Sequence, residues 1–246
     1  MWWAAALPLL PLALPMAVRT RRTALRLAPA AGACEGVAGA ECAGEPFRLL
    51  LLGESTVAGV GASCLDFALA GRLALALSGR LERPVAWRAV GENGITAGEA
   101  CARLLPQVAE QDYDLVALVF GVNDTTQFSS SRRWLGALEQ LIEHFRQRGA
   151  QVVCTAVPPL QHFTALPWLL RYMLGRRAAL LDRQLSALAL AQGAGYCAVS
   201  LEMQPQFLAI DGYHPSALGY QVWGEQLAQW LVSRPLAEVG VDFTVL

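Results

Sequence analysis

The stretch FRLLLLGESTVAGVGA, residues Phe47–Ala62, decides which fold we expect for this chain. The apolar run at its start is broken only by Arg48 and is short enough to be a buried strand. The run ends at Gly53, and Ser55 and a segment of small residues follow. A strand that ends in this way and leads into a helix places Ser55 at the carboxyl edge of a sheet, where open α/β sheets bind ligands. The same stretch also fits an ordinary turn in which the serine caps a helix.

Further apolar runs alternate with helical periodicity along the rest of the chain. The other predicted strands cover residues 85–90, 115–120, 151–157 and 196–201. The predicted helices cover residues 65–78, 97–109, 132–148, 167–192 and 216–232, the fourth either continuous or broken at Gly175. Continuous apolar strands separated by helices are typical of a parallel sheet covered on both faces. We therefore expect an α/β fold, a three-layer α/β/α sandwich with a mostly parallel sheet of about five strands.

The chain of 246 residues suits one domain preceded by a tail. We assign residues 1–46 to an apolar N-terminal segment and a linker, and residues 47–246 to the catalytic domain. Residues 1–18 are nearly all apolar and precede an arginine cluster, a charge order unlike that of a secretory signal. Three prolines weaken a membrane-spanning helix there. We expect a cytoplasmic protein and leave two interpretations of residues 1–18 open, membrane association and an arm packed on the domain.

Composition excludes several kinds of partner and chemistry. The net charge is −1 and the main body has no basic run, so we expect no nucleic-acid partner. The 19 basic residues are all arginine, which excludes lysine-based chemistry. The six cysteines form no C-x-x-C pair, so neither a zinc site nor a thiol-redox site is indicated. Only Cys34 and Cys42 are close enough in sequence to bridge, and we expect a reduced chain.

Polar loops follow the predicted strands at one edge of the sheet. Ser55 follows the first strand, Gly94 the second, Asn123 the third, and Asp211 and His214 the fifth. Right-handed crossovers bring all these loops to the same end of a parallel sheet. A serine hydroxyl becomes a nucleophile when a histidine takes its proton, and a carboxylate fixes that histidine's tautomer. The sequence therefore indicates serine hydrolysis, with oxyanion donors at the amides of Ser55 and Gly94 and the side chain of Asn123.

The four blocks that carry these residues, GEST, ENGITAGE, GVND and DGYH, resemble those of the SGNH hydrolases, also called GDSL-type esterases and lipases. Their order and spacing agree with the family from about residue 49 to residue 231. One departure is Gly53-Glu54-Ser55, where the family usually has Gly-Asp-Ser. The hydrogen bonds of that acid must therefore rearrange, and we give Glu54 and Asp124 supporting roles.

The resemblance implies a metal-free and cofactor-free hydrolase that acts on small-molecule or lipid carboxylic esters through an acyl-enzyme. Ser55 is then the nucleophile, His214 the general base and acid, and Asp211 the orienting carboxylate. Two alternatives stay open: an acyltransferase with the same triad, and a catalytically silent binding module. The oligomeric state is open as well.

A second apolar stretch follows the fourth predicted strand, LQHFTALPWLLRYML at residues 160–174. It carries more apolar surface than one helix face needs. Two interpretations stay open: the stretch walls a pocket for an apolar acyl chain, with Trp168 and His162 beside it, or it packs only on the sheet.

Overall fold

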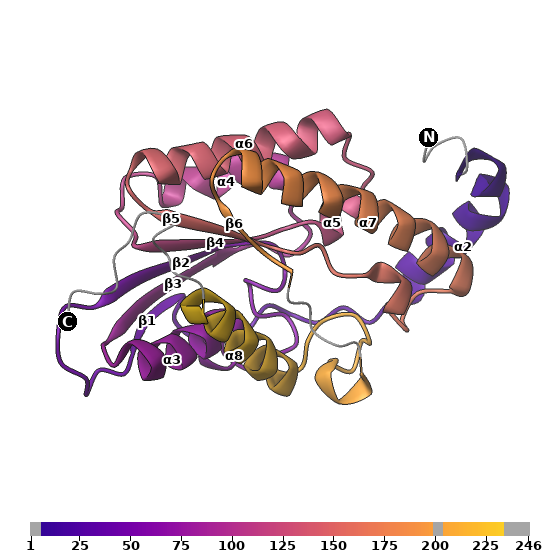
Figure 1. Cartoon of the computed structure of the whole chain (residues 1–246). Helices are drawn as coiled ribbons and strands as arrows, with labels where there is room; N and C mark the ends of the chain where they lie inside the picture. Colours follow the sequence, from indigo (N-terminus) through magenta and orange to yellow (C-terminus); the bar gives the residue numbers. More distant parts are fainter. Residues whose placement is uncertain (1–5, 199–203, 234–246) are drawn as a thin grey trace.

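The structure is a computed structural model that describes residues 6–198 and 204–233. Its centre is a six-stranded sheet in the order β1-β3-β2-β4-β5-β6 (Figure 1). The strands are β1 (Glu35–Ala38), β2 (Phe47–Gly53), β3 (Val85–Gly91), β4 (Leu115–Val119), β5 (Gln151–Thr155) and β6 (Gly195–Cys197). Strand β1 is antiparallel to β3, and the other neighbours are parallel. The expected fold class is confirmed, and the stretch assigned to a linker contributes the additional edge strand β1.

Helices cover both faces of this sheet, as Figure 1 shows. The α-helices are α2 (Leu10–Thr23), α3 (Leu69–Leu81), α4 (Ala97–Arg103), α5 (Val122–Thr126), α6 (Ser131–Gln147), α7 (Trp168–Ala191) and α8 (Ala217–Ser233). The short 3-10 helices are η1 (Leu7–Leu9), η2 (Leu65–Phe67), η3 (Leu105–Gln107), η4 (Leu160–His162) and η5 (Pro205–Phe207). Helices α4, α6 and α7 lie on one face, and α3 and α8 on the other.

The central strand β2 shows why the predicted strands are continuously apolar. Leu50 and Leu52 pack in the core on the side of α6 and α7, whereas Leu49 and Leu51 pack in the core on the side of α3 and α8. All four side chains are fully buried. A strand covered on both faces has no side that faces solvent, so the residues that point to either face are apolar.

One predicted helix is shorter in the structure, and the helix that the sequence left either continuous or broken at Gly175 is continuous, each for a local reason. The helix predicted at residues 97–109 ends at Arg103 and gives way to η3, which contains Pro106. A proline ring and its missing N–H do not fit a helix interior. Helix α7, by contrast, runs unbroken through Gly175. A Cβ at Gly175 would lie within 2.9 Å of the Gln161 backbone nitrogen, so the glycine allows η4 to approach the helix closely.

The N-terminal segment forms η1 and α2, and the 14-residue α2 carries Pro15 in its interior. Ala6 and Ala13 are buried in the same core cluster as Leu169 and Met173 of α7. Within residues 6–198 and 204–233, no helix has the length and apolarity to cross a bilayer. The expected localisation, with membrane association through residues 1–18 left open, is therefore contradicted. Residues 6–18 lie as an arm beside α7, and residues 1–5 lie outside the described part.

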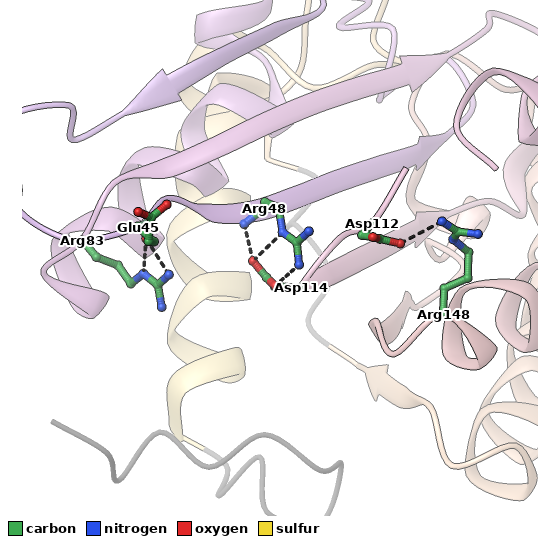
Figure 2. A network of polar contacts seen from close by, with 6 residues as sticks. All are labelled: Glu45, Arg48, Arg83, Asp112, Asp114 and Arg148. Carbon is green, nitrogen blue, oxygen red and sulfur yellow. Dashed lines mark hydrogen bonds and ion pairs between the residues drawn. The ribbon is translucent and has the colours of Figure 1, made fainter. Parts of the chain in front are cut away.

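Hydrogen bonds and ion pairs of charged side chains connect the amino ends of neighbouring strands (Figure 2). The Arg48 backbone N–H and guanidinium donate to the Asp114 carboxylate, with an Nη2 to Oδ1 distance of 2.8 Å. Arg148 pairs with Asp112 at 2.8 Å, and the Arg83 guanidinium donates to the Glu45 carbonyl. These contacts join the starts of neighbouring strands at the edge opposite Ser55.

Candidate active site

Ser55 lies directly beyond β2, in a tight turn at the carboxyl edge of the sheet. Its strand ends at Gly53, which pairs with Gly91 of β3 and Val119 of β4. Three strands therefore end side by side, and the loops that follow them start from the same place. The Ser55 carbonyl accepts a hydrogen bond from the Val60 N–H at 3.0 Å, which closes the turn behind the hydroxyl. Ser55 is buried, with 7% of its surface exposed.

His214 connects Ser55 with Asp211. Its Nε2 lies 3.0 Å from Ser55 Oγ, and its Nδ1 lies 2.6 Å from Asp211 Oδ2. The side chains of His214 and Asp211 are 14% and 3% exposed. A carboxylate against Nδ1 holds the proton on that nitrogen and leaves Nε2 able to accept a proton from the serine hydroxyl.

The other oxygen of Asp211 fixes the carboxylate to its own loop. Asp211 Oδ1 accepts hydrogen bonds from the N–H groups of Tyr213 and His214, both at 3.0 Å. Burial alone would raise the pKa of Asp211, but the His214 ring and these backbone donors outweigh it, so the pKa lies below its usual value. Asp211 is thus a carboxylate at neutral pH, as an orienting group for an imidazole must be.

Aromatic rings hold the histidine loop against the segment that follows β5. The Tyr213 ring stands edge-on to His214 at a centroid distance of 5.3 Å, and Phe163 stands edge-on to Tyr213 at 4.9 Å. Phe163 is buried in the core. The sequence assigned no role to Tyr213, and it placed Phe163 only within the apolar stretch at residues 160–174. The position of Tyr213, between Asp211 and His214, was the only signal available.

The three groups expected to be oxyanion donors belong to Ser55, Gly94 and Asn123. The backbone N–H groups of Ser55 and Gly94 donate to no other residue in the described part of the chain. Gly94 has φ +87, and a Cβ there would meet no neighbour, so the backbone conformation rather than crowding explains the glycine. Asn123 Nδ2 donates to the Ile95 carbonyl at 3.0 Å, which leaves its second amide hydrogen for a ligand. The Gly94 carbonyl accepts from Gln127 Nε2 at 2.6 Å, a contact that the sequence did not indicate.

The two acids assigned supporting roles are buried, and both accept backbone hydrogen bonds. Glu54 is 3% exposed, and its two oxygens accept the N–H groups of Val122 and Asn123, each at 2.9 Å. Burial raises the pKa of Glu54 to about 8, against the lowering effect of these donors. Asp124 is 1% exposed and accepts the Ala97 N–H at 2.9 Å, at the start of α4. Neither carboxyl forms a hydrogen bond with the Ser55 hydroxyl, whose partner in the described structure is His214.

The stretch at residues 160–174 contributes mostly to the core. Its buried apolar residues are Leu160, Phe163, Leu166, Leu169, Leu170, Met173 and Leu174. Trp168 and Tyr172 instead project into solvent, with 69% and 52% of their surfaces exposed. His162 is exposed on η4 and has no hydrogen bond with the triad. Most of the apolar surface that suggested an acyl pocket is therefore used to pack α7 onto the sheet.

No three His, Cys, Asp or Glu side chains in the described part of the chain are grouped so that they could hold a metal ion. All six cysteines are free thiols, so Cys34 and Cys42 do not bridge in this structure. The chemistry that the described groups offer at Ser55 is nucleophilic attack assisted by proton transfer through His214.

The chain is similar to known esterases and lipases in sequence and in fold. A family model described as "GDSL-like Lipase/Acylhydrolase family" matches residues 51–222. A GDSL-like esterase of Mycobacterium tuberculosis is 26% identical over 188 residues, which cover 73% of this chain but only 60% of that protein. Among solved structures, a lipase/acylhydrolase from Enterococcus faecalis has a TM-score of 0.61 at 19% identity, covering 76% of this chain and 96% of that one. An acetylxylan esterase from Geobacillus stearothermophilus has a TM-score of 0.55 at 17% identity, with coverages of 81% and 97%.

Proposed function

We propose that this chain hydrolyses carboxylic esters through an acyl-enzyme on Ser55. The premise is that the chain belongs to the GDSL-like lipase/acylhydrolase family. The observation that supports this proposal most is the continuous contact from Ser55 Oγ through the His214 ring to Asp211, at 3.0 and 2.6 Å. Each of these groups has the partner that a nucleophile, a base and an orienting carboxylate require.

In the proposed reaction, Ser55 Oγ forms a bond to the ester carbonyl carbon while His214 Nε2 takes the hydroxyl proton. The N–H groups of Ser55 and Gly94 and the side chain of Asn123 stabilise the negative charge that develops on the carbonyl oxygen. The alcohol leaves with the proton from His214, and the acyl group stays on Ser55. Water then attacks the acyl-enzyme, with His214 as base, and restores the free serine.

The test is a comparison of the wild type with Ser55→Ala and His214→Ala on para-nitrophenyl acetate. We expect both variants to fold and to lose about 10³-fold or more in kcat. A fluorophosphonate probe should label the wild type and not Ser55→Ala. Retained hydrolysis by folded Ser55→Ala would exclude the mechanism, and an unlabelled, inactive wild type would favour a silent binding module. Product analysis with an added alcohol separates hydrolysis from acyl transfer.

For the substrate we propose an ester with a short acyl group, which revises the longer apolar chain expected from residues 160–174. The support is that most of that segment's apolar side chains are buried in the core, while Trp168 is 69% exposed. A similar fold also serves an acetylxylan esterase. We expect kcat/KM to fall steadily across para-nitrophenyl esters from acetate to decanoate. A rise toward medium chains that Trp168→Ala abolishes would restore the apolar pocket.

A further inference from the structure

The feature that the proposed mechanism leaves unused is the carboxyl group of Glu54. It stands immediately before Ser55, where the family usually has an aspartate, and it is 3% exposed. Its two oxygens accept one hydrogen bond each, from the N–H groups of Val122 and Asn123, at 2.9 Å. Glu54 therefore joins the end of β2 to the first turn of α5.

The same contacts continue to the other potential oxyanion donors. Asn123, whose backbone Glu54 holds, donates through its side chain to the Ile95 carbonyl at 3.0 Å, next to Gly94. Its neighbour Asp124 accepts the Ala97 N–H at the start of α4, directly after that loop. One set of hydrogen bonds, most of them part-buried, thus links the residue before the nucleophile, the Asn123 amide and the loop that carries Gly94.

We propose that Glu54 is a positioning residue that sets the oxyanion hole by holding the Asn123 backbone at a fixed distance from Ser55. This proposal rests on the proposed function, because it assigns Asn123 to the oxyanion hole. Among the described residues, the Glu54 carboxyl is hydrogen-bonded to Val122 and Asn123 and not to the Ser55 hydroxyl or the His214 ring. Its effect on the reaction passes through Asn123, and a donor must be fixed before charge develops if it is to lower the barrier.

The length and the two oxygens of Glu54 both matter for this role. Protonated or ionised, a carboxyl group keeps two oxygens that can accept an N–H, whereas a glutamine presents one oxygen and one nitrogen that cannot accept. Glu54→Gln therefore sets an N–H donor against a backbone N–H at Val122 or Asn123. Glu54→Asp keeps both oxygens but is shorter by one carbon–carbon bond, about 1.5 Å, so α5 must shift to meet it.

The main experiment measures kcat and KM for Glu54→Gln on para-nitrophenyl acetate. We expect kcat to fall about 10- to 100-fold, less than the loss of a whole oxyanion donor, with KM within about threefold because ground-state binding is unchanged. The matched control is Asp182→Asn. Asp182 also accepts a backbone N–H at a strand end, from Val157 at 2.9 Å, and the Tyr196 hydroxyl at 2.8 Å. We expect this control to keep kcat within about twofold.

A double-mutant cycle with Asn123→Ala tests whether Glu54 acts through Asn123. We expect Glu54→Gln with Asn123→Ala to be no slower than Asn123→Ala alone, because residues that act as a unit are not additive. Additive losses, or a Glu54→Gln variant with wild-type kcat, would overturn the proposal. So would an equal loss of kcat in Asp182→Asn.

If Glu54→Gln does not fold, Glu54→Asp replaces it in the same double-mutant cycle. We then expect a lower kcat for Glu54→Asp and no further loss when it is combined with Asn123→Ala, and additive losses or a wild-type kcat would overturn the proposal. The outcome is separable from that of the proposed function. Activity retained by Ser55→Ala refutes the nucleophile, whereas an active enzyme indifferent to changes at Glu54 refutes only the positioning role.

Discussion

The two ends of the parallel strands hold their charged groups in opposite ways. At the amino ends, the Arg48 and Asp114 side chains are 50% and 32% exposed, and the charges pair with one another beside solvent (Figure 2). At the carboxyl ends, the carboxyls of Glu54, Asp124 and Asp211 are buried, and each accepts backbone N–H groups. Water can replace a partner at the first edge but has little access at the second.

This difference has energetic and functional consequences. Exposed ion pairs contribute about 0–1 kcal/mol each, because water solvates either partner once the pair is broken. Burying a carboxyl group costs desolvation free energy. The group keeps its hydrogen bonds because a buried carboxyl without partners would cost still more free energy. The carboxyl edge therefore has a fixed geometry, which preorganised donors require. We expect substitutions there to change kcat and substitutions at the amino edge to change stability slightly.

The largest effect should come from Asp211→Asn. The amide cannot hold the His214 tautomer as a carboxylate does, so we expect kcat to fall about 10⁴-fold with the fold intact. Activity assays beside near-ultraviolet circular dichroism measure both quantities. A loss below about tenfold would mean that the backbone of the loop, rather than the carboxylate, orients the histidine.

Asn123→Ala should have the next largest effect. Removing one oxyanion donor costs about 10²- to 10³-fold in kcat, since the donor matters most once charge has developed. Steady-state kinetics on para-nitrophenyl acetate will separate kcat from KM. A change confined to KM would remove Asn123 from the oxyanion hole and make it a ground-state contact.

The pKa of Glu54 predicts a pH-dependent stability at the carboxyl edge. Burial raises this pKa to about 8, so the folded protein binds the proton more tightly than the unfolded chain does. The contribution is fully present below the unfolded pKa of about 4.3 and is lost as the pH rises to about 8. We expect the free energy of unfolding of the wild type, measured in urea relative to Glu54→Gln, to fall across this window. A constant or rising difference would show that the N–H donors stabilise an ionised Glu54.

The smallest effect should come from the amino edge. A double-mutant cycle of Arg48→Ala and Asp114→Ala should give a coupling energy of about 0.2–1 kcal/mol in urea unfolding. We expect kcat to stay within about twofold of the wild type for all three variants, because this edge lies opposite Ser55. A large loss of kcat would mean that the two edges are coupled through the sheet.

The sequence predicted the parallel core because a strand buried on both faces must be mainly apolar, as β4 is throughout and as β2 is apart from Arg48. It did not predict β1, since Glu35–Ala38 is partly exposed and gains its order by pairing with β3. The predicted strand at residues 196–201 begins as β6 at Gly195, and its last residues, 199–201, lie outside the described part of the chain.

The candidate site was predictable to the extent that its residues stand in separate short blocks at strand ends. Ser55, Asp211 and His214 lie together in the structure, as do the loops of Gly94 and Asn123. The contacts of Gln127 and Tyr213 were not predictable, because they join residues through loop conformation rather than through a repeating pattern. The same holds for the buried Arg177, which donates to the Ser129 carbonyl behind Asp124.

The sequence by itself determined the fold class, the family and the identity of the groups at the carboxyl edge. The fold class follows from apolar periodicity, whereas the family follows from the resemblance of the four blocks GEST, ENGITAGE, GVND and DGYH. Three properties were decided only by the tertiary structure. Residues 6–18 pack as an arm, and most of the apolar surface of residues 160–174 belongs to the core. Glu54 accepts hydrogen bonds from two backbone N–H groups. These three properties depend on distances between segments remote in sequence, and such distances arise only when the chain packs.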